Sequence, residues 1–214
     1  MGFAMAIGLL GRKIGMTQVY DAKGQVVPVT VVQAGPCPIV QRKTAAQDGY
    51  EAVQIAFGPQ PKKRRVTQPL RGHFERAKVP YHDALRELRL DGSEGDLAVG
   101  QVLTVDLFAP GDAVRVTGVS KGKGFQGGVR RWGYRGGPMT HGSMFHRAPG
   151  SIGASSFPSR VFPGHHMPGR MGGDRRTVRG LRIVGVVKEQ NLLLISGAIP
   201  GPPGGLLTVR KGRL

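Results

Sequence analysis

Short runs of alternating apolar and polar residues occur along both ends of the chain, and this period-two pattern predicts β-strands. Bends at Asp21–Gly24 and Ala34–Pro36 separate several of the runs. The predicted strands are Phe3–Leu10 (continuing as a glycine-interrupted Ile7–Val19), Val26–Gln33, Cys37–Gln41, Tyr50–Phe57, Ala84–Leu90, Gln101–Phe108, Ala113–Val119, Val178–Val187, Asn191–Ser196 and Leu206–Arg210.

Close spacing of so many short strands favours a barrel or sandwich over a βαβ fold, so the predicted fold class is mainly β. Gln101–Phe108 has the cleanest alternation. Pro28 cannot donate to a strand ladder and predicts an edge or a strand start. Helix is expected only at Pro69–Ala77 and in a mini-helix over Phe125–Trp132.

The alternation stops between residues 118 and 176, a segment that we call the arm. The surrounding stretch Ala113–Gly173 has sixty-one residues and no Asp or Glu. Ordering a glycine-rich backbone costs roughly 1–2 kcal/mol per residue, and the arm has little apolar area to offset this cost. We therefore expect residues 1–117 and 177–214 to form one globular domain, with the arm as an excursion that a partner orders. The cations of the arm and its continuation are Lys121, Lys123, Arg130, Arg131, Arg135, Arg147, Arg160, Arg170, Arg175 and Arg176.

A polyanion is the partner that can interact favourably with so many cations at once. The whole chain carries a net charge of +18 and has a pI near 11.2, which indicates nucleic acid first and an anionic membrane second. A long apolar run or a basic amphipathic helix would be needed for membrane binding, and neither occurs in the sequence. Cys37 is the only cysteine, which fits a reducing cytoplasm.

A second basic segment covers residues 59–80, where seven cations face one carboxylate, Glu75. It could be a solvated loop, as most charge runs are, or a second phosphate-contacting surface. The arm favours the second interpretation. The candidate contacts in this segment are Lys62, Lys63, Arg64 and Arg65.

Chemistry other than binding finds no support in the sequence. Gly122, Gly124 and Gly127 match a dinucleotide fingerprint, but later glycines forbid the helix and no acid follows before Asp174. The histidines lack anionic ligand partners, so base stacking or phosphate contact is favoured over metal binding, with plain exposure as the alternative; they are His141, His146, His165 and His166. No nucleophile elbow or P-loop occurs, so no enzyme, cofactor or small-molecule substrate is predicted.

Four aromatic residues lie among the arm's arginines at irregular spacing. Burial is the usual fate of such rings, and stacking on bases becomes plausible where burial is not available. We expect Phe125 to pack against the core through the mini-helix. Trp132 is left open between packing and base contact.

Motifs along nearly the whole chain resemble the ribosomal protein L3 family of the bacterial large subunit. They are LLGRKIGMTQVYD, VTVVQAGPCPIVQRKT, DGYEAVQIAFG, RGHFERAKV, GDAVRVTGVSKGKGFQGGVRRWGYRGGP, HGSMFHRAPGSIG and NLLLISGAIPGPPGG, in the order of the family. The resemblance implies a six-stranded β-barrel of the translation-protein type with a long, irregular, basic extension.

Function and partners follow from the resemblance as expectations. It implies a non-catalytic constituent of the ribosome that binds 23S rRNA, helps nucleate 50S assembly and sends the extension towards the peptidyl transferase centre. The implied neighbours are the large-subunit proteins L13, L14, L17 and L19. The loop nearest that centre would run from Gly150 to Ser156, with candidate contacts at Ser151, Ser155 and Ser156. The alternative is a free-standing RNA chaperone or regulator that uses the same arm.

Two departures from the family pattern stand in this loop and after it. Ser156 occupies the position where some bacterial members carry a methylated glutamine, so that modification is not expected here. His165 and His166 replace the usual lysines. Because histidine changes charge near physiological pH, phosphate contact at this point is expected to be weaker or pH-dependent. RNA affinities of His165→Lys and His166→Lys that match the parent at every pH would contradict this expectation.

Overall fold

The computed structural model describes residues 7–60, 62–90 and 97–212. Residues 3–6 of the predicted strand Phe3–Leu10 lie outside this part of the chain. The chain divides into two compact units: residues 1–119 together with 175–214 form the first, and residues 120–174 form the second. The second is called the 120–174 unit below.

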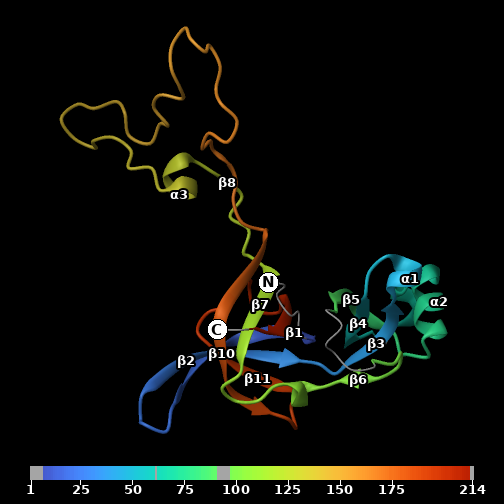
Figure 1. Ribbon diagram of the computed structural model, residues 1–214. Helices are drawn as coiled ribbons and strands as arrows, with labels where there is room; N and C mark the ends of the chain where they lie inside the picture. Colours follow the sequence, from blue (N-terminus) through green and yellow to red (C-terminus); the bar gives the residue numbers. More distant parts are fainter. Residues whose placement is uncertain (1–6, 61, 91–96, 213–214) are drawn as a thin grey trace. The chain divides into compact units, whose positions relative to one another are not determined.

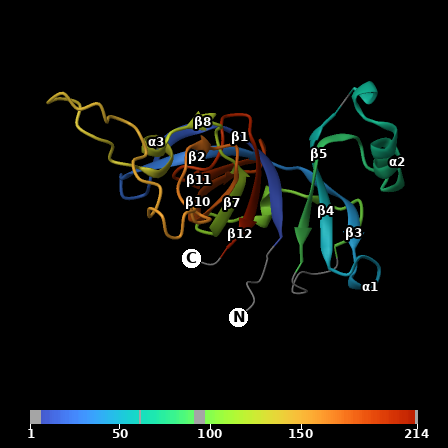
Figure 2. The same cartoon turned by 90° about the horizontal axis from the view of Figure 1, so that it is seen from above.

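Six strands of the first unit close into a ring in the order β1-β12-β7-β10-β11-β2. The ribbons of these strands lie together in Figures 1 and 2. Every neighbouring pair is antiparallel, including the β1–β2 pair that closes the ring. The prediction of a mainly β fold is confirmed. The strands are β1 (Gly8–Tyr20), β2 (Val26–Ala34), β7 (Ala113–Val119), β10 (Arg175–Val187), β11 (Leu192–Ser196) and β12 (Leu206–Lys211).

Alternation in these strands sorts side chains between the core and the surface. In β7 and β12 the buried apolar side chains are Val114, Val116, Leu207 and Val209, each no more than 1% exposed. Val116 lies opposite Val209 in the register of the two strands. Successive side chains point to opposite faces of a strand, so the intervening residues of both strands face away from the core.

β1 is one continuous strand, although its glycines predict interruptions. A register shift between Lys13 and Gly15 absorbs the irregularity as a bulge. Backbone approaches two of these glycines closely: a Cβ on Gly8 would lie 2.2 Å from the Val209 carbonyl oxygen and one on Gly11 2.7 Å from the Gln33 carbonyl oxygen, whereas nothing lies within 4 Å of a Cβ on Gly15. Pro28 precedes Val29, the first β2 residue paired with β11. It therefore lies near a strand start, as predicted, but in a strand with neighbours on both sides.

A four-stranded sheet in the order β5-β4-β3-β6 completes the first unit. Its Ile39, Val53 and Ile55 are fully buried and belong to the same hydrophobic core as the ring's Leu9 and Leu193. The predicted helix is confirmed as α2, whose Phe74 packs against the other face of this sheet. The elements are β3 (Cys37–Lys43), α1 (Ala45–Asp48), β4 (Ala52–Pro59), η1 (Lys63–Arg65), α2 (Gln68–Arg76), β5 (His82–Arg89) and β6 (Val102–Leu103).

The predicted strand Gln101–Phe108 is wrong. Only β6 is extended there, and the 3₁₀ turn η2 (Val105–Leu107) follows it. Leu103, Val105 and Phe108 are all buried, and the Phe108 N–H donates to the Val105 carbonyl at 3.0 Å. A spacing of three between Val105 and Phe108 brings both to the core only if the backbone turns.

The 120–174 unit contains little regular structure. It consists of β8 (Phe125–Gln126) paired with β9 (Gly169–Arg170), the helix α3 (Gly128–Trp132) and long irregular loops. The predicted mini-helix is confirmed in part, because it begins at Gly128. The expected packing of Phe125 is wrong: this residue lies in β8 and is 75% exposed. Among the described residues, no helix is long and apolar enough to cross a membrane.

Candidate nucleic-acid interface

Two antiparallel limbs form the base of the 120–174 unit. The Ser120 N–H donates to the Asp174 carbonyl at 2.9 Å, and the Lys123 N–H donates to the Met171 carbonyl at 2.9 Å. Gly172 has a φ of +73°, and a Cβ on it would lie 2.1 Å from the Lys121 carbonyl oxygen. A side chain at this point would push the limbs apart, so only glycine fits here.

Helix α3 is tied to the returning limb through the Met167 carbonyl. Arg131 Nη1 donates to this oxygen at 2.7 Å, and Trp132 Nε1 donates to it at 2.9 Å. The Trp132 ring stacks on His166, with centroids 3.8 Å apart and an interplanar angle of 2°. The Tyr134 hydroxyl donates to the His166 carbonyl. Trp132 therefore makes an intramolecular stack, while 42% of it stays exposed.

Further along, backbone contacts hold the loops in place of a core. The Gly137 N–H donates to the His146 carbonyl at 2.9 Å, and His146 Nδ1 lies 3.0 Å from the Pro138 carbonyl oxygen. A Cβ on Gly137 would lie only 2.0 Å from the Phe145 carbonyl oxygen. Glycine at this position thus lets two backbone segments touch directly.

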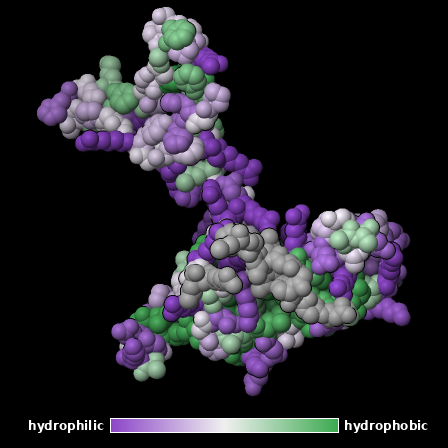
Figure 3. Space-filling view, in the orientation of Figure 1, coloured by the Kyte–Doolittle hydropathy of each residue, from purple (hydrophilic) through white to green (hydrophobic). Residues whose placement is uncertain are grey.

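Across residues 120–174, all of which are described, Gly128 alone is buried. Large apolar side chains are left in solvent, with Met144 98% and Phe157 89% exposed. Arg131 is half-buried, and the other seven cations of this unit are exposed; they are Lys121, Lys123, Arg130, Arg135, Arg147, Arg160 and Arg170. On the face shown in Figure 3 the loops are mostly hydrophilic with scattered apolar patches. The unit presents cations and unburied rings on a hydrogen-bonded backbone, which is the chemistry that phosphates and unpaired bases bind.

The remaining predicted contacts have various surroundings. Ser151 is exposed, and its hydroxyl donates to the Gly153 carbonyl at 3.0 Å. The Arg160 guanidinium lies 5.2 Å from the ring centroid of Phe162. Exposed residues of the 120–174 unit also include His141, Ser155, Ser156 and His165. Arg175 and Arg176 begin β10 in the first unit and are exposed there.

The basic segment 59–80 is separate from the 120–174 unit in the sequence and belongs to the first unit. Lys62, Arg64 and Arg65 are exposed before α2, and Lys63 begins η1. Arg71 is partly buried, and its Nε donates to the Val66 carbonyl at 2.9 Å. This segment thus presents exposed cations of its own.

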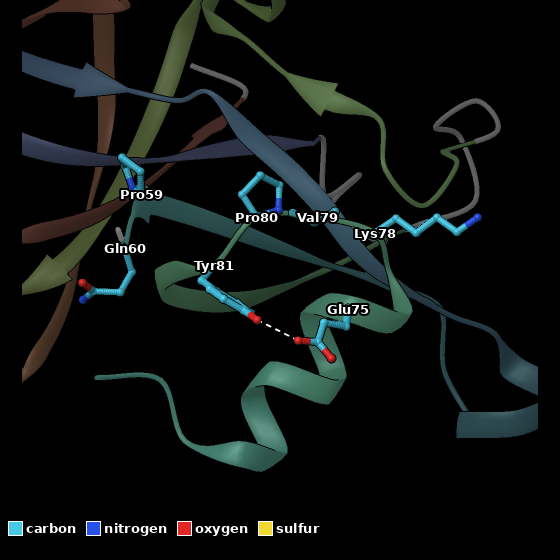
Figure 4. Close-up of a pocket in the computed structure, with 7 residues that line it drawn as sticks. All are labelled: Pro59, Gln60, Glu75, Lys78, Val79, Pro80 and Tyr81. Carbon is cyan, nitrogen blue, oxygen red and sulfur yellow. Dashed lines mark hydrogen bonds between the residues drawn. The ribbon is translucent and has the colours of Figure 1, made fainter. Parts of the chain in front are cut away.

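Other chemistries find little support in the geometry. No group of three His, Cys, Asp or Glu that could hold a metal ion occurs among the described residues. Burial raises the pKa of the Cys37 thiol to about 12, so it is not an activated nucleophile. A hollow of about 850 Å³ lies beside α2, and the Tyr81 hydroxyl in its lining donates to Glu75 at 2.7 Å. Figure 4 shows the side chains that line it. Proline and valine supply much of its remaining lining, so it offers few groups for catalysis.

Sequence reasoning missed a group of cations on the ring. A groove of about 390 Å³ in the first unit is lined by five arginines and three threonines; the arginines are Arg89, Arg115, Arg175, Arg179 and Arg210. Its strand residues alternate with buried ones, as Arg115 and Thr117 do around Val116. The signal was present in the sequence, since Arg and Thr occupy the polar positions of three predicted strands.

Comparison with known proteins identifies the family. The family model for ribosomal protein L3 matches residues 91–191. The chain is 51% identical over 210 residues to the large ribosomal subunit protein uL3 of Syntrophotalea carbinolica, which covers 98% of this chain and 99% of that protein. With this identity over almost the full length of both chains, the protein belongs to the ribosomal protein L3 family.

Proposed function

We propose that this protein is a non-catalytic structural constituent of the large ribosomal subunit that binds 23S rRNA. One observation carries the proposal: the 120–174 unit exposes seven cations, and no residue except Gly128 is buried in it. Its conformation buries little apolar surface of its own, so a bound polyanion supplies the interactions that offset the cost of ordering it. The family to which the chain belongs supports RNA as that polyanion.

The finer features of the proposal follow the family resemblance. The six-stranded ring is the β-barrel of the translation-protein type, and the arm extends through rRNA towards the peptidyl transferase centre. The protein acts early in 50S assembly in the cytoplasm, beside L13, L14, L17 and L19. Peptide-bond chemistry belongs to the RNA, which this protein influences only by positioning nucleotides.

Within this proposal the residues have different roles. Exposed Lys and Arg side chains of the 120–174 unit contact phosphates, whereas close-packed glycines such as Gly137 let backbone lie directly against its neighbours. The stack of Trp132 on His166 holds α3 against the returning limb, so this tryptophan supports the arm as well as facing RNA. The exposed cations of segment 59–80 form the second contact surface.

A salt series on a 23S 3′-domain transcript tests the proposal. The comparison is between the full chain and a variant with residues 120–174 replaced by a short Gly-Ser linker. Such a linker can close, because Val119 and Arg175 are directly paired across β7 and β10. With the seven exposed cations engaged, the slope of log affinity against log salt should be steeper by roughly 5–6 in the full chain.

Equal slopes with high affinity in both proteins would assign RNA binding to the first unit and contradict the proposal for the arm. Co-fractionation with 50S particles at high salt separates the proposed constituent from a free-standing RNA chaperone. A large free pool bound to diverse RNAs would favour the chaperone.

A further inference from the structure

The arginine groove of the first unit lies outside the arm and outside segment 59–80. Its walls come from three neighbouring ring strands, β12, β7 and β10, and from Tyr50, Glu87 and Arg89 at β4 and β5. We infer that this groove is a further nucleic-acid site, which holds a length of RNA backbone by its phosphodiester groups. The inference rests on the proposed function for the identity of the polyanion.

Strand register concentrates positive charge in this groove. Arg115 of β7 lies directly opposite Arg210 of β12, and Thr117 lies opposite both Thr208 and Thr177. Like charges placed directly opposite in an antiparallel pair destabilise the sheet. The facing of Arg115 and Arg210 in this groove therefore indicates a bound anion between their side chains.

One donor in the groove has no partner within the described residues. The Nη2 atom of Arg115 is buried and makes no hydrogen bond. Leaving a buried charged donor unsatisfied is costly, and an oxygen of a bound phosphate would satisfy it. This orphaned atom is the observation that separates the groove from an ordinary solvated basic face.

Acidic side chains are scarce among the described residues that line the groove. Glu87 is its one carboxylate, and Lys43 already holds it at 3.0 Å while the Tyr50 hydroxyl donates to it at 2.9 Å. The Lys43 hydrogen bond lowers the pKa of Glu87, so this carboxylate is charged and engaged at neutral pH. Among the described residues that line the groove, five arginines thus accompany one engaged carboxylate.

Hydroxyl groups at the centre suit phosphate oxygens. Thr117 Oγ1 and Thr177 Oγ1 lie 2.8 Å apart and share one hydrogen bond. Two hydroxyls carry two protons, so the second proton remains available to donate to a ligand. The volume of about 390 Å³ exceeds that of a single ion, since one water occupies about 30 Å³ of liquid. A run of backbone phosphates fills such a space, with Arg forks as bidentate donors.

The test uses the full chain, an unrelated 20-base-pair RNA duplex, and the double variant Arg115→Gln with Arg179→Gln. The matched control is Arg86→Gln with Arg182→Gln, which removes two exposed arginines from β5 and β10 that do not line the groove. We expect the groove variant to lose about tenfold or more in affinity relative to the control. Its salt slope should also fall by about 1.5–2.

Site-specific protection makes the result independent of the arm. An arginine-selective glyoxal reagent is applied with and without the duplex, and peptide mass spectrometry reads modification of Arg179 and, as the reference, of Arg86. RNA should protect Arg179 and leave Arg86 reactive. Thermal unfolding without RNA checks the fold: Arg115→Gln should not lower the Tm, because it removes a charge facing Arg210.

Two outcomes would overturn the inference. One is a groove variant that matches the control in affinity, slope and protection while the full chain still binds the 23S transcript; the proposed function would then stand without this site. The other is protection of Arg179 by poly-glutamate but not by RNA, which would make an acidic protein the partner. Failure of the full chain to prefer the 23S transcript over unrelated RNA would count against the proposed function instead.

Discussion

The six-stranded ring buries large apolar side chains, whereas the 120–174 unit leaves them exposed to solvent. In the ring, Leu193, Ile195 and Val209 are fully buried, whereas Met144 and Phe157 of the other unit are almost fully exposed. The ring gains its stability from burial at roughly 25 cal/mol per Å². The 120–174 unit has hydrogen bonds between backbone segments, glycine contacts and a single ring stack in place of a core. One chain thus combines a unit that is held by its own hydrophobic core with a unit that has exposed side chains and no such core.

Truncating an apolar side chain in each region should give the largest difference in the free energy of unfolding. We expect Leu207→Ala to lower the free energy of unfolding by about 2–5 kcal/mol, because Leu207 is 1% exposed and its loss leaves a cavity. Phe157→Ala should change it by less than about 0.5 kcal/mol. Urea unfolding measures both. Similar losses for the two variants would mean that the 120–174 unit has a core after all.

The second prediction compares the loss of a buried cation in the first unit with the loss of an exposed cation in the 120–174 unit. Lys13 is 8% exposed, and its Nζ donates to the carbonyls of Ile199 and Gly201 at 3.0 and 3.2 Å. Lys13→Met should cost about 1–3 kcal/mol of stability, because these buried acceptors lose a charged donor.

The counterpart is Arg147→Met in the 120–174 unit, which should leave unfolding unchanged and weaken RNA binding. Chemical denaturation and RNA titration of both variants give the two readouts. Loss of stability in Arg147→Met would show that this arginine supports the fold of its unit.

Glycine substitutions test how the 120–174 unit holds its shape. Gly172→Ala forces a side chain into φ +73° and against the Lys121 carbonyl, whereas nothing lies within 4 Å of a Cβ at Gly122. Gly172→Ala should abolish hydrogen-exchange protection of the Lys123 amide, while Gly122→Ala should keep it. Global stability should change by less than about 1 kcal/mol in both, because the ring is untouched. A Gly172→Ala protein with full protection would contradict the limb pairing.

The smallest effect concerns acid sensitivity of the first unit. The Lys211 ammonium, 2.8 Å from the Asp112 carboxylate, is the main cause that lowers the pKa of Asp112. Because the pKa of Asp112 is lower in the folded than in the unfolded protein, the ion pair stabilises the folded state above the unfolded pKa of about 3.9. This stabilisation is lost as the pH falls through the folded pKa. Asp112→Asn should thus cost less than about 1 kcal/mol at pH 7, and this cost should shrink as the pH falls through the lowered pKa of Asp112.

Unfolding curves from pH 7 to pH 2 check this pH dependence. Glu189→Gln, at an exposed turn position, is the control. A cost of Asp112→Asn that stays constant across this range would exclude the ion pair as its source.

The local pattern of apolar and polar residues predicted many of the elements, because the periods of strands and helices are visible in residues close together in the sequence. Ala113–Val119 was predicted with the bounds of β7, and α2 lies within one residue of its predicted range. Gln101–Phe108 misled the prediction because Leu103 and Val105 alternate, while Phe108 reaches the core only through the turn η2. Phe125 misled it because aromatic character predicts burial without saying whether a core is within reach.

Candidate site residues divide in the same way. Exposure of the arm's cations followed from composition, since a stretch without acids or regular apolar positions has nothing to bury them. The stack of Trp132 on His166 joins residues 34 positions apart, and no periodicity signals it. The arginine groove was missed because its members lie on strands that become neighbours only when the ring closes.

By itself, the sequence determined the mainly β class, the excursion of the arm between two strands, its charge and its family. These properties depend on residues close together in the chain or on composition. The tertiary structure alone decided the closure of the ring, the continuity of β1 through its glycines, and the facing of Arg115 and Arg210. Each of these depends on strand register between distant segments, which is set by the core that they bury together and not by any one segment.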